Sequence, residues 1–319
     1  MGTYEAMLHW CLERRDVFDD PVARLSSASK AELEFLTYGV AEVRPTPSAL
    51  PVLDLAVEKD PGSFWLRARQ LFVRVKSGRE LEHEKQVLHF RTAVTHGEAA
   101  LALWPGSTVV RLNLSLAYGE LDDYGNAERV LRALNELDPS YADAWVNLGG
   151  VLVKQERWAE GLAALRKGVE LQPRDVSNWM ALGLAADSCL TSVEGSDPLF
   201  QRAVDTSVEA WRKVHELDPK EWQAYLYLGA AYMAVGRFDE AIAEYDAGMP
   251  LHPHDRDLRN FKAEALFDAT RVRAALELEL EVLKDWPKDP SARDNFERWL
   301  PSITDPAERA ALEARLPPR

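Results

Sequence analysis

Proline recurs at a fixed interval along most of this chain. Two series of prolines are spaced 34 residues apart: Pro105, Pro139 and Pro173, and then Pro219, Pro253 and Pro287. Only 18 of the 319 residues are proline, so chance is a poor explanation for four identical intervals. A period of this length is typical of repeat architectures, in which each unit is one small motif that buries its apolar face against its neighbours. The spacing therefore predicts a repeat array.

Other residue types fall into register when each unit is counted so that its proline is position 32. Position 8 is small, as Ser115, Gly149, Gly183, Gly229 and Ala263. Position 4 is aromatic in Trp145, Trp179 and Tyr225. Apolar residues recur at the period of an amphipathic helix, and strand-like alternation is scarce. We therefore expect an all-α protein whose units each hold two helices, A and B, which approach closely at position 8.

Two units carry the clearest motifs: Trp145-Val-Asn-Leu148-Gly149, and Tyr225 followed by Leu228, Gly229 and Tyr232. This pattern resembles the tetratricopeptide repeat family, whose signature is W-x2-L-G-x2-Y followed by alanine and proline. The resemblance implies a right-handed α-solenoid of helix pairs. In that family, the A helices line the concave side of the solenoid.

The 34-residue frame divides most of the chain into seven predicted repeats, with a helical cap at each end. Two intervals exceed the period, by 10 and 12 residues, which we attribute to insertions near 78–89 and 191–201 at the turn between helices A and B. A solenoid buries its core between neighbouring units, so no further domain division is expected. The predicted segments are an N-terminal cap at 1–29, repeats at 30–63, 64–107, 108–141, 142–175, 176–221, 222–255 and 256–289, and C-terminal capping helices at 290–319.

The N-terminal segment carries one apolar stripe at helical spacing, formed by Tyr4, Met7, Leu8, Cys11 and Leu12. A helix with this stripe has to bury it. Either it caps the first repeat beside Phe35 and Tyr38, or it lies in a groove as an occluding or dimer-forming arm.

The net charge of −14 and the isoelectric point near 5.1 disfavour a nucleic acid or an anionic membrane surface as the partner, because such binding depends on neutralising phosphates with Lys and Arg. A basic partner is allowed but hardly implied. The two cysteines, Cys11 and Cys189, form no CxxC motif and are expected to be small buried apolar residues in a reducing compartment. We find no secretory signal and no membrane span, so the cytoplasm is expected, unless an export signal has been removed.

No spacing typical of catalysis is present: there is no phosphate-binding loop, no nucleophile elbow and no HExxH. His252 and His254 could form a metal-ligand pair, but no third ligand is evident. We therefore expect no catalytic residue, no metal and no cofactor. Trp104, Trp158 and Trp286 occupy predicted packing positions, whereas Trp65 is as readily a surface contact as a core residue.

Function is expected on the inner surface, to which the resemblance assigns positions 2, 5, 6, 9, 12 and 13 of each repeat. Two amides, Asn113 and Asn147, would hydrogen-bond the backbone of a bound segment among apolar pockets. The predicted groove residues are Trp65, Leu112, Asn113, Leu116, Val146, Asn147, Met180, Leu226, Tyr227 and Phe261. The same stripe could instead pack against the chain's own ends.

Some members of the family grip acidic chaperone tails with a clamp of Lys, Asn and Arg side chains. With Asn147 as its central residue, the clamp would need basic residues where this chain has Leu112, Ser177 and Ala181. Chaperone-tail binding is therefore disfavoured. The expected function is a non-catalytic scaffold that holds a peptide or helical segment of a partner protein in its concave groove. The alternative is an assembly or regulatory subunit of a larger machine, such as a bacterial secretion or pilus apparatus, which would use the insertions and convex faces. An enzyme with a cryptic site is the third hypothesis.

Overall fold

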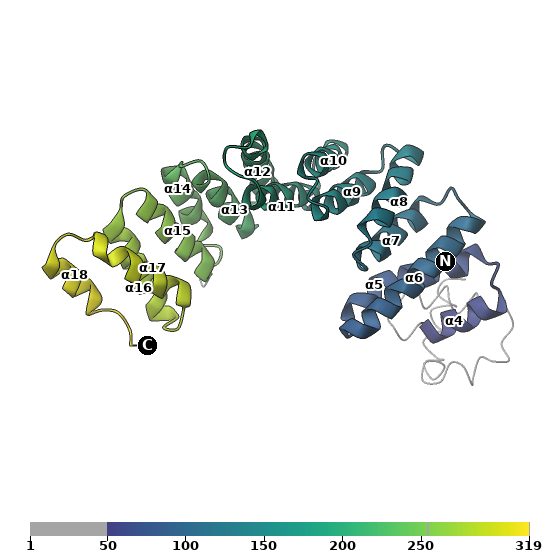
Figure 1. Ribbon diagram of the computed structural model, residues 1–319, viewed down its shortest axis with the longest axis horizontal. Coiled ribbons are helices and arrows are strands. Elements are labelled where there is room, and N and C mark those ends of the chain that lie inside the picture. The colour runs from purple at the N-terminus through teal and green to yellow at the C-terminus, as the bar shows by residue number, and fades with distance from the viewer. Residues whose placement is uncertain (1–49, 254, 319) are drawn as a thin grey trace, which may run out of the picture. The chain divides into compact units, whose positions relative to one another are not determined.

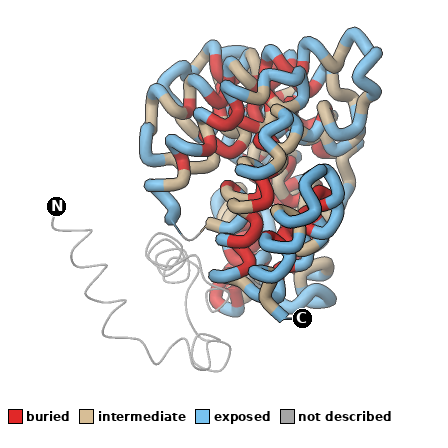
Figure 2. The backbone as a smooth tube through the Cα atoms, turned by 90° about the vertical axis from the view of Figure 1, so that its left-hand side faces the viewer, coloured by how far each residue is buried: buried red, intermediate tan, exposed pale blue. Residues whose placement is uncertain are grey.

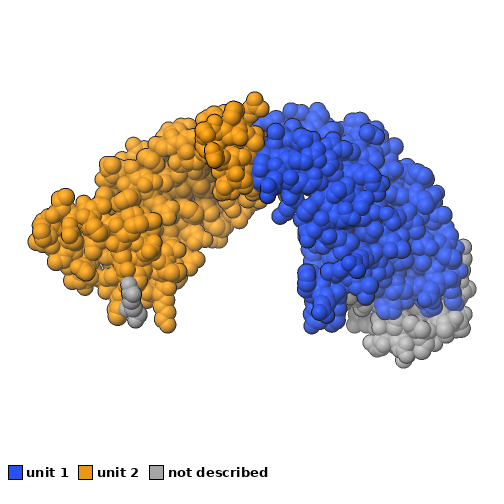
Figure 3. Space-filling view, viewed as in Figure 1, with its two compact units in different colours: residues 1–171 blue, residues 172–319 orange. Residues whose placement is uncertain are grey.

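The computed structural model describes residues 50–253 and 255–318. Within these ranges the regular structure is entirely helical, in agreement with the all-α expectation. The apolar N-terminal stripe, the proposed contacts at Phe35 and Tyr38, and most of the repeat at 30–63 lie outside the described residues. The chain forms two compact units that divide between Leu171 and Gln172 (Figure 3). The boundary lies near the end of the predicted repeat 142–175, and an array whose repeats contact only their neighbours can divide at any interface between repeats.

Unit 1 is a stack of antiparallel helix pairs (Figure 1). Its helices are α4 (Leu50–Lys59), α5 (Phe64–Ser77), the short 3₁₀ helix η3 (Gly78–Glu80), α6 (His83–Leu103), α7 (Thr108–Gly119), α8 (Tyr124–Leu137), α9 (Ala142–Lys154) and α10 (Trp158–Leu171). The pairs are α5 with α6, α7 with α8, and α9 with α10. Each B helix also packs against the A helix that follows it in the unit.

Unit 2 continues the same alternation of A and B helices. Its helices are α11 (Val176–Ser192), α12 (Pro198–Leu217), α13 (Trp222–Met233), α14 (Phe238–Gly248), α15 (Arg256–Asp268), α16 (Val272–Asp285), α17 (Pro290–Trp299), the 3₁₀ helix η4 (Leu300–Ser302) and α18 (Pro306–Glu313). Helix α17 packs against α16, at the end of the last pair. The six A helices from α5 to α15 begin at the residues from which the 34-residue frame counts each unit.

Position 4 and the repeat proline are linked by a hydrogen bond across the turn between repeats. The side chain at position 4 donates to the backbone carbonyl of the proline six residues earlier, which holds the turn against the new A helix. The five bonds of this kind are Arg67 Nε to Pro61 (2.8 Å), Trp145 Nε1 to Pro139 (2.9 Å), Trp179 Nε1 to Pro173 (3.0 Å), Tyr225 Oη to Pro219 (3.0 Å) and Arg259 Nη2 to Pro253 (2.7 Å). The two sequence signals therefore report one structural contact.

The glycines at position 8 lie where helix A meets helix B, as predicted. A Cβ atom at Gly149 would lie 2.5 Å from Leu165 Cγ, at Gly183 2.6 Å from Trp211, and at Gly229 2.3 Å from Tyr245. Real Cβ atoms do not approach other atoms so closely, so the seam has no room for a larger residue. Buried residues accordingly concentrate between the helices, and exposed residues lie at the outer turns (Figure 2).

The aromatic residue of helix B that meets the position-8 glycine also contacts helix A of the next repeat. Trp211 of α12 stacks on Tyr227 of α13 with ring centroids 4.7 Å apart, and Tyr245 of α14 stacks on Phe261 of α15 at 6.3 Å. The equivalent residue of α16 is Glu279, which accepts a hydrogen bond from Asn295 Nδ2 of α17 at 2.9 Å. The last interface thus replaces an aromatic pair with a buried carboxyl and amide.

Both insertions lengthen helix B. Helix α6 has 21 residues and α12 has 20, against 11 to 14 residues in α8, α10, α14 and α16. The Asp197 side chain caps α12 through the Leu199 amide at 2.7 Å, and Pro198 takes the first helical position. The longer α11 and α12 bury additional residues between them, including Cys189, which is fully buried as expected.

Candidate functional site

Several A helices also contact the next A helix in the same unit. In unit 1, α7 contacts both α5 and α9, and in unit 2, α15 contacts both α13 and α17. The predicted groove residues lie on these helices and on α11. The structure places Trp65, Leu112, Asn113, Leu116, Val146 and Asn147 in unit 1, and Met180, Leu226, Tyr227 and Phe261 in unit 2. We therefore treat the two inner faces separately.

The two asparagines of unit 1 differ in their access to a ligand. Asn113 is 8% exposed and its Nδ2 donates to the Val109 carbonyl at 2.9 Å. Asn147 is half-buried, and its Nδ2 donates to the Asp143 carbonyl at 2.7 Å. Each amide uses one N–H on its own helix, so a second N–H and the side-chain oxygen are left for hydrogen bonds to a partner's backbone. Asn147 is more exposed than Asn113.

Most of the predicted apolar groove residues also contribute to interhelical packing. Leu112 packs against the cluster around Leu134 and Leu148, and Leu116 packs against the preceding cluster. A Cβ at Gly168 would lie 2.4 Å from Val146 Cγ2, so Val146 contacts helix α10 closely. Leu226 is buried and Met180 is half-buried. These side chains offer only their outer edges to a partner.

The predicted inner face of unit 2 carries two aromatic side chains. Tyr227 is half-buried against Trp211, and Phe261 is 39% exposed above Tyr245. Asp187 lies beside the first pair and accepts hydrogen bonds from Ser207 Oγ and from Trp211 Nε1 at 2.8 Å. Burial raises the pKa of the Asp187 carboxyl to about 6, against the opposing effect of these two hydrogen bonds.

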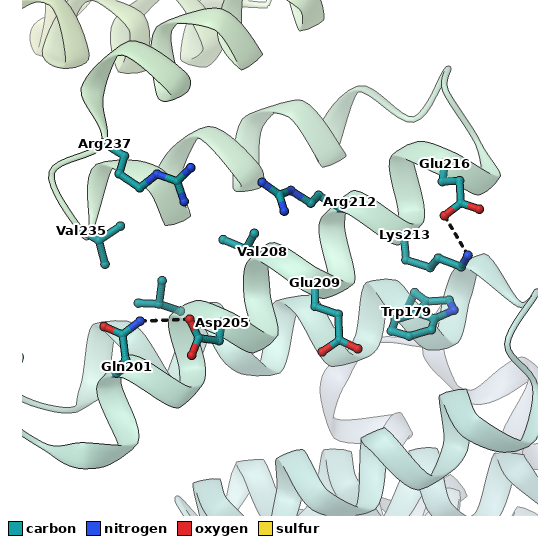
Figure 4. A pocket seen from close by; sticks show the side chains of 11 residues that line it. Trp179, Gln201, Asp205, Val208, Glu209, Arg212, Lys213, Glu216, Val235 and Arg237 are labelled. Carbon is teal, nitrogen blue, oxygen red and sulfur yellow. Dashed lines mark hydrogen bonds and ion pairs between the residues drawn. The ribbon is translucent and has the colours of Figure 1, made fainter.

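Each long B helix also borders a cleft. In unit 2, a cleft of about 800 Å³ runs along α12 and reaches the turn between α13 and α14. Val204 and Val208 are among the residues that line it. The Arg212 and Arg237 guanidinium groups point toward each other across it (Figure 4). Both arginines lie against the Tyr232 ring, at 5.8 and 4.5 Å from its centroid.

Unit 1 has an equivalent cleft, of about 610 Å³, between α6 and the turn that joins α7 to α8. Val87, Arg91 and Val94 line it from α6, and Tyr118 to Asp123 line it from the turn. The two clefts occupy the same place in their repeats, because each arises where an extended helix B overhangs the next, shorter pair.

Comparison with known proteins identifies the repeats. The tetratricopeptide repeat model matches residues 120–184 and 201–265. The chain carries tetratricopeptide repeats. A solved tetratricopeptide repeat protein from Parabacteroides merdae has a similar fold, with a TM-score of 0.50 and 12% identity, over 94% of this chain and 100% of that one.

Two curated relatives match shorter stretches of the chain. Human protein O-mannosyl-transferase TMTC1 is 24% identical over 162 residues, which are 51% of this chain and 18% of that protein. The peroxisomal targeting signal receptor of Komagataella phaffii is 31% identical over 81 residues, which are 25% of this chain and 14% of the receptor. The chain thus spans less than a fifth of the length of the curated relatives it matches. A tetratricopeptide repeat array is in general a scaffold for protein–protein interactions.

The tetratricopeptide frame alone did not reveal one apolar surface. We predicted Trp104 to be a packing residue, but it is 50% exposed, and Trp65 beside it is 68% exposed. Leu103 and Val109, which are close to Trp104 in the sequence, are 47% and 60% exposed. We call Phe64, Trp65, Leu103, Trp104 and Val109 the aromatic edge. The frame places these residues at the ends of helices, which says nothing about how far neighbouring repeats cover them.

The described residues hold no cluster of three His, Cys, Asp or Glu side chains arranged to bind a metal. His254 of the predicted pair lies outside them. No helix of the described ranges has the length and apolar character needed to cross a bilayer.

Proposed function

We propose that this protein is a non-catalytic scaffold that holds an extended or helical segment of a partner protein on the inner faces of its A helices. The proposal rests on the accessibility of two position-6 side chains. The Asn147 amide of unit 1 is half-buried, and the Phe261 ring of unit 2 is 39% exposed. An amide oxygen can fix the register of a bound backbone, and an aromatic ring can anchor an apolar side chain. The similarity to a targeting signal receptor supports such a role.

Photo-crosslinking tests which face engages a partner. A photoreactive amino acid is introduced at Asn147 or at Phe261, and at Lys167 on the exposed side of α10 as the control. The protein is irradiated in cells, and the crosslinked peptides are identified by mass spectrometry. We expect a crosslinked partner segment from each inner position and none from Lys167. Crosslinks from Lys167 alone would contradict the proposal.

The two clefts support a second candidate function, that of an assembly or regulatory subunit that binds through its insertions. The clefts border the extended helices α6 and α12, and insertions in repeat arrays often form binding surfaces. Arg237→Ala, which changes the unit 2 cleft, would weaken the partner in this case, whereas Asn147→Ala would not. Co-purification with each variant separates the two functions.

A further inference from the structure

The aromatic edge joins three helices at one place on unit 1. Phe64 and Trp65 begin α5, Trp104 follows α6, and Val109 lies in the first turn of α7. Phe64 contacts both tryptophans edge to face, with centroids 5.2 Å from Trp65 and 5.0 Å from Trp104, and the two indoles are 6.4 Å apart. The Trp104 ring lies close to Gly106: a Cβ atom at Gly106 would be 3.2 Å from Trp104 Nε1.

The exposure of this edge is unusual for its residue types. Tryptophan is normally largely buried, and a group of exposed large apolar side chains commonly marks a binding surface. Tryptophan is also among the residues that contribute most to binding energy at protein interfaces. The other described residues that expose a tryptophan or large aliphatic side chain to this degree are scattered singly along the helices.

The charge around the edge differs from that of the whole chain. The protein carries 52 acidic and 38 basic residues, yet residues 61–79 and 99–119 contain no aspartate or glutamate. These segments hold α5, α7 and the residues just before them, and the acids Asp60 and Glu98 directly precede the two segments. Arg67 and Arg111 bond backbone carbonyls just before the two helices, at Pro61 (2.8 Å) and Ser107 (3.5 Å). Within the described chain, neither arginine is paired with a carboxylate.

The caps of α5 and α7 reinforce this positive character. The two helices are capped by the uncharged side chains of Ser63 and Ser107, and neither has an acid in its first turn. In α11, α13 and α15 the capping residue is Asp or Glu instead. An acidic cap offsets the positive end of the helix dipole, and a serine does not.

We propose that the aromatic edge binds an acidic linear segment of a partner protein, in which an aromatic or leucine side chain stands next to aspartate or glutamate. The apolar side chain packs against Trp65 and Trp104, and the carboxylate faces Arg67 and Arg111. This surface lies at the ends of the helices and borders the predicted inner face at Trp65 and Val109, which both hold position 2. It goes beyond the proposed inner-face function because it adds the turn residues Phe64 and Trp104 and does not depend on Asn147.

Selection of random peptides displayed on phage, against the full-length protein, tests the proposal. We expect enriched peptides to combine an aromatic residue or leucine with an adjacent acid. Synthetic copies are then measured by fluorescence anisotropy. Trp65→Ala and Trp104→Ala should each weaken binding by roughly tenfold or more, because truncation of an aromatic anchor is usually this costly. Replacing the acids of the peptide with lysine should have a similar effect, and added salt should weaken binding.

Two controls separate the possible results. Both tryptophans are exposed, so their alanine variants should melt at the wild-type temperature; Asn147→Ala should bind the selected peptides normally. Peptides that depend on Asn147 and not on the tryptophans would overturn this inference and support the inner-face function. Enrichment of basic peptides, or no enrichment, would also overturn it. Tighter binding of labelled oligothymidylate than of any selected peptide would identify a single-strand nucleic acid surface instead.

Discussion

At the scale of single residues, the position-8 glycines test how tightly helices A and B pack. Gly149 and Gly150 are neighbours on α9 and form a matched pair. A Cβ at Gly149 would meet backbone atoms of α10 at 2.9 and 3.0 Å, whereas a Cβ at Gly150 would meet nothing within 4 Å. We expect Gly149→Ala to lower the free energy of unfolding by about 1–3 kcal/mol through overpacking.

The matched variant should behave differently in the same denaturant titration. Gly150→Ala should leave stability unchanged or raise it by roughly 0.5–1 kcal/mol, because alanine has the higher helix propensity. Equal effects of the two variants would contradict the assigned packing of α9 on α10. Gly183→Leu should likewise lower the melting temperature, because its side chain would enter the space of the Trp211 ring.

Glu279 predicts a pH dependence. Its side chain is fully buried, and burial raises its pKa from 4.5 to about 8, assisted by the charges of Glu264 and Asp289 and opposed by Asn295 and Arg298. Between pH 4.5 and about pH 8, the Glu279 carboxyl is ionised in the unfolded chain and protonated in the folded chain. The folded state therefore loses stability relative to the unfolded state as pH rises. The contribution is at most about 1.4 kcal/mol per pH unit and levels off above pH 8.

Glu279→Gln should remove this dependence, because an amide cannot ionise and its oxygen can still accept from Asn295. Chemical denaturation from pH 5 to 9 should show the variant gaining stability over wild type as pH rises. Glu277→Gln is the control, since this carboxylate is at the surface of the same helix and pairs with Arg315. An unchanged slope in Glu279→Gln would contradict the assigned ionisation.

At the scale of an element, the bond from position 4 to the repeat proline should stabilise each turn. Trp145→Phe keeps most of the ring but removes the donor to the Pro139 carbonyl. We expect a loss of about 0.5–1.5 kcal/mol in the free energy of unfolding. Trp158→Phe serves as the control, because no hydrogen bond of its indole is found among the described residues. If both variants lost the same free energy of unfolding, the loss would come from ring packing and not from the hydrogen bond.

The insertion of unit 2 is a longer helical hairpin, so it should be removable without loss of the fold. Deleting 190–201 restores the 34-residue length and joins the shortened α11 and α12. We expect circular dichroism to show a helical protein that still unfolds cooperatively, because Gly183 and Trp211, which pack against each other, both lie outside the deleted residues. A variant that no longer folds would show that the extended tip belongs to the core of this unit.

At the scale of the whole molecule, the division after Leu171 predicts independent folding of the second unit. A fragment of residues 172–319 keeps the Asp175 cap of α11 and every helix pair of unit 2. It should show a cooperative thermal transition by circular dichroism. A fragment that starts at Pro198 lacks α11 and uncovers Trp211, so it should not. Failure of the first fragment to fold would contradict the division.

The sequence alone determined the repeat frame, and with it the starts of the A helices and the close approach at position 8. It could do so because these features depend on contacts within one repeat or between neighbours, and every copy repeats them. The tertiary structure decided which predicted groove residues a partner can reach. Asn113 and Leu226 are covered by adjacent helices, whereas Trp104 is not. Glu279 became a buried acid, and two clefts formed beside α6 and α12, for the same physical reason: burial depends on the lengths and side chains of neighbouring helices, which vary from repeat to repeat even where the spacing does not.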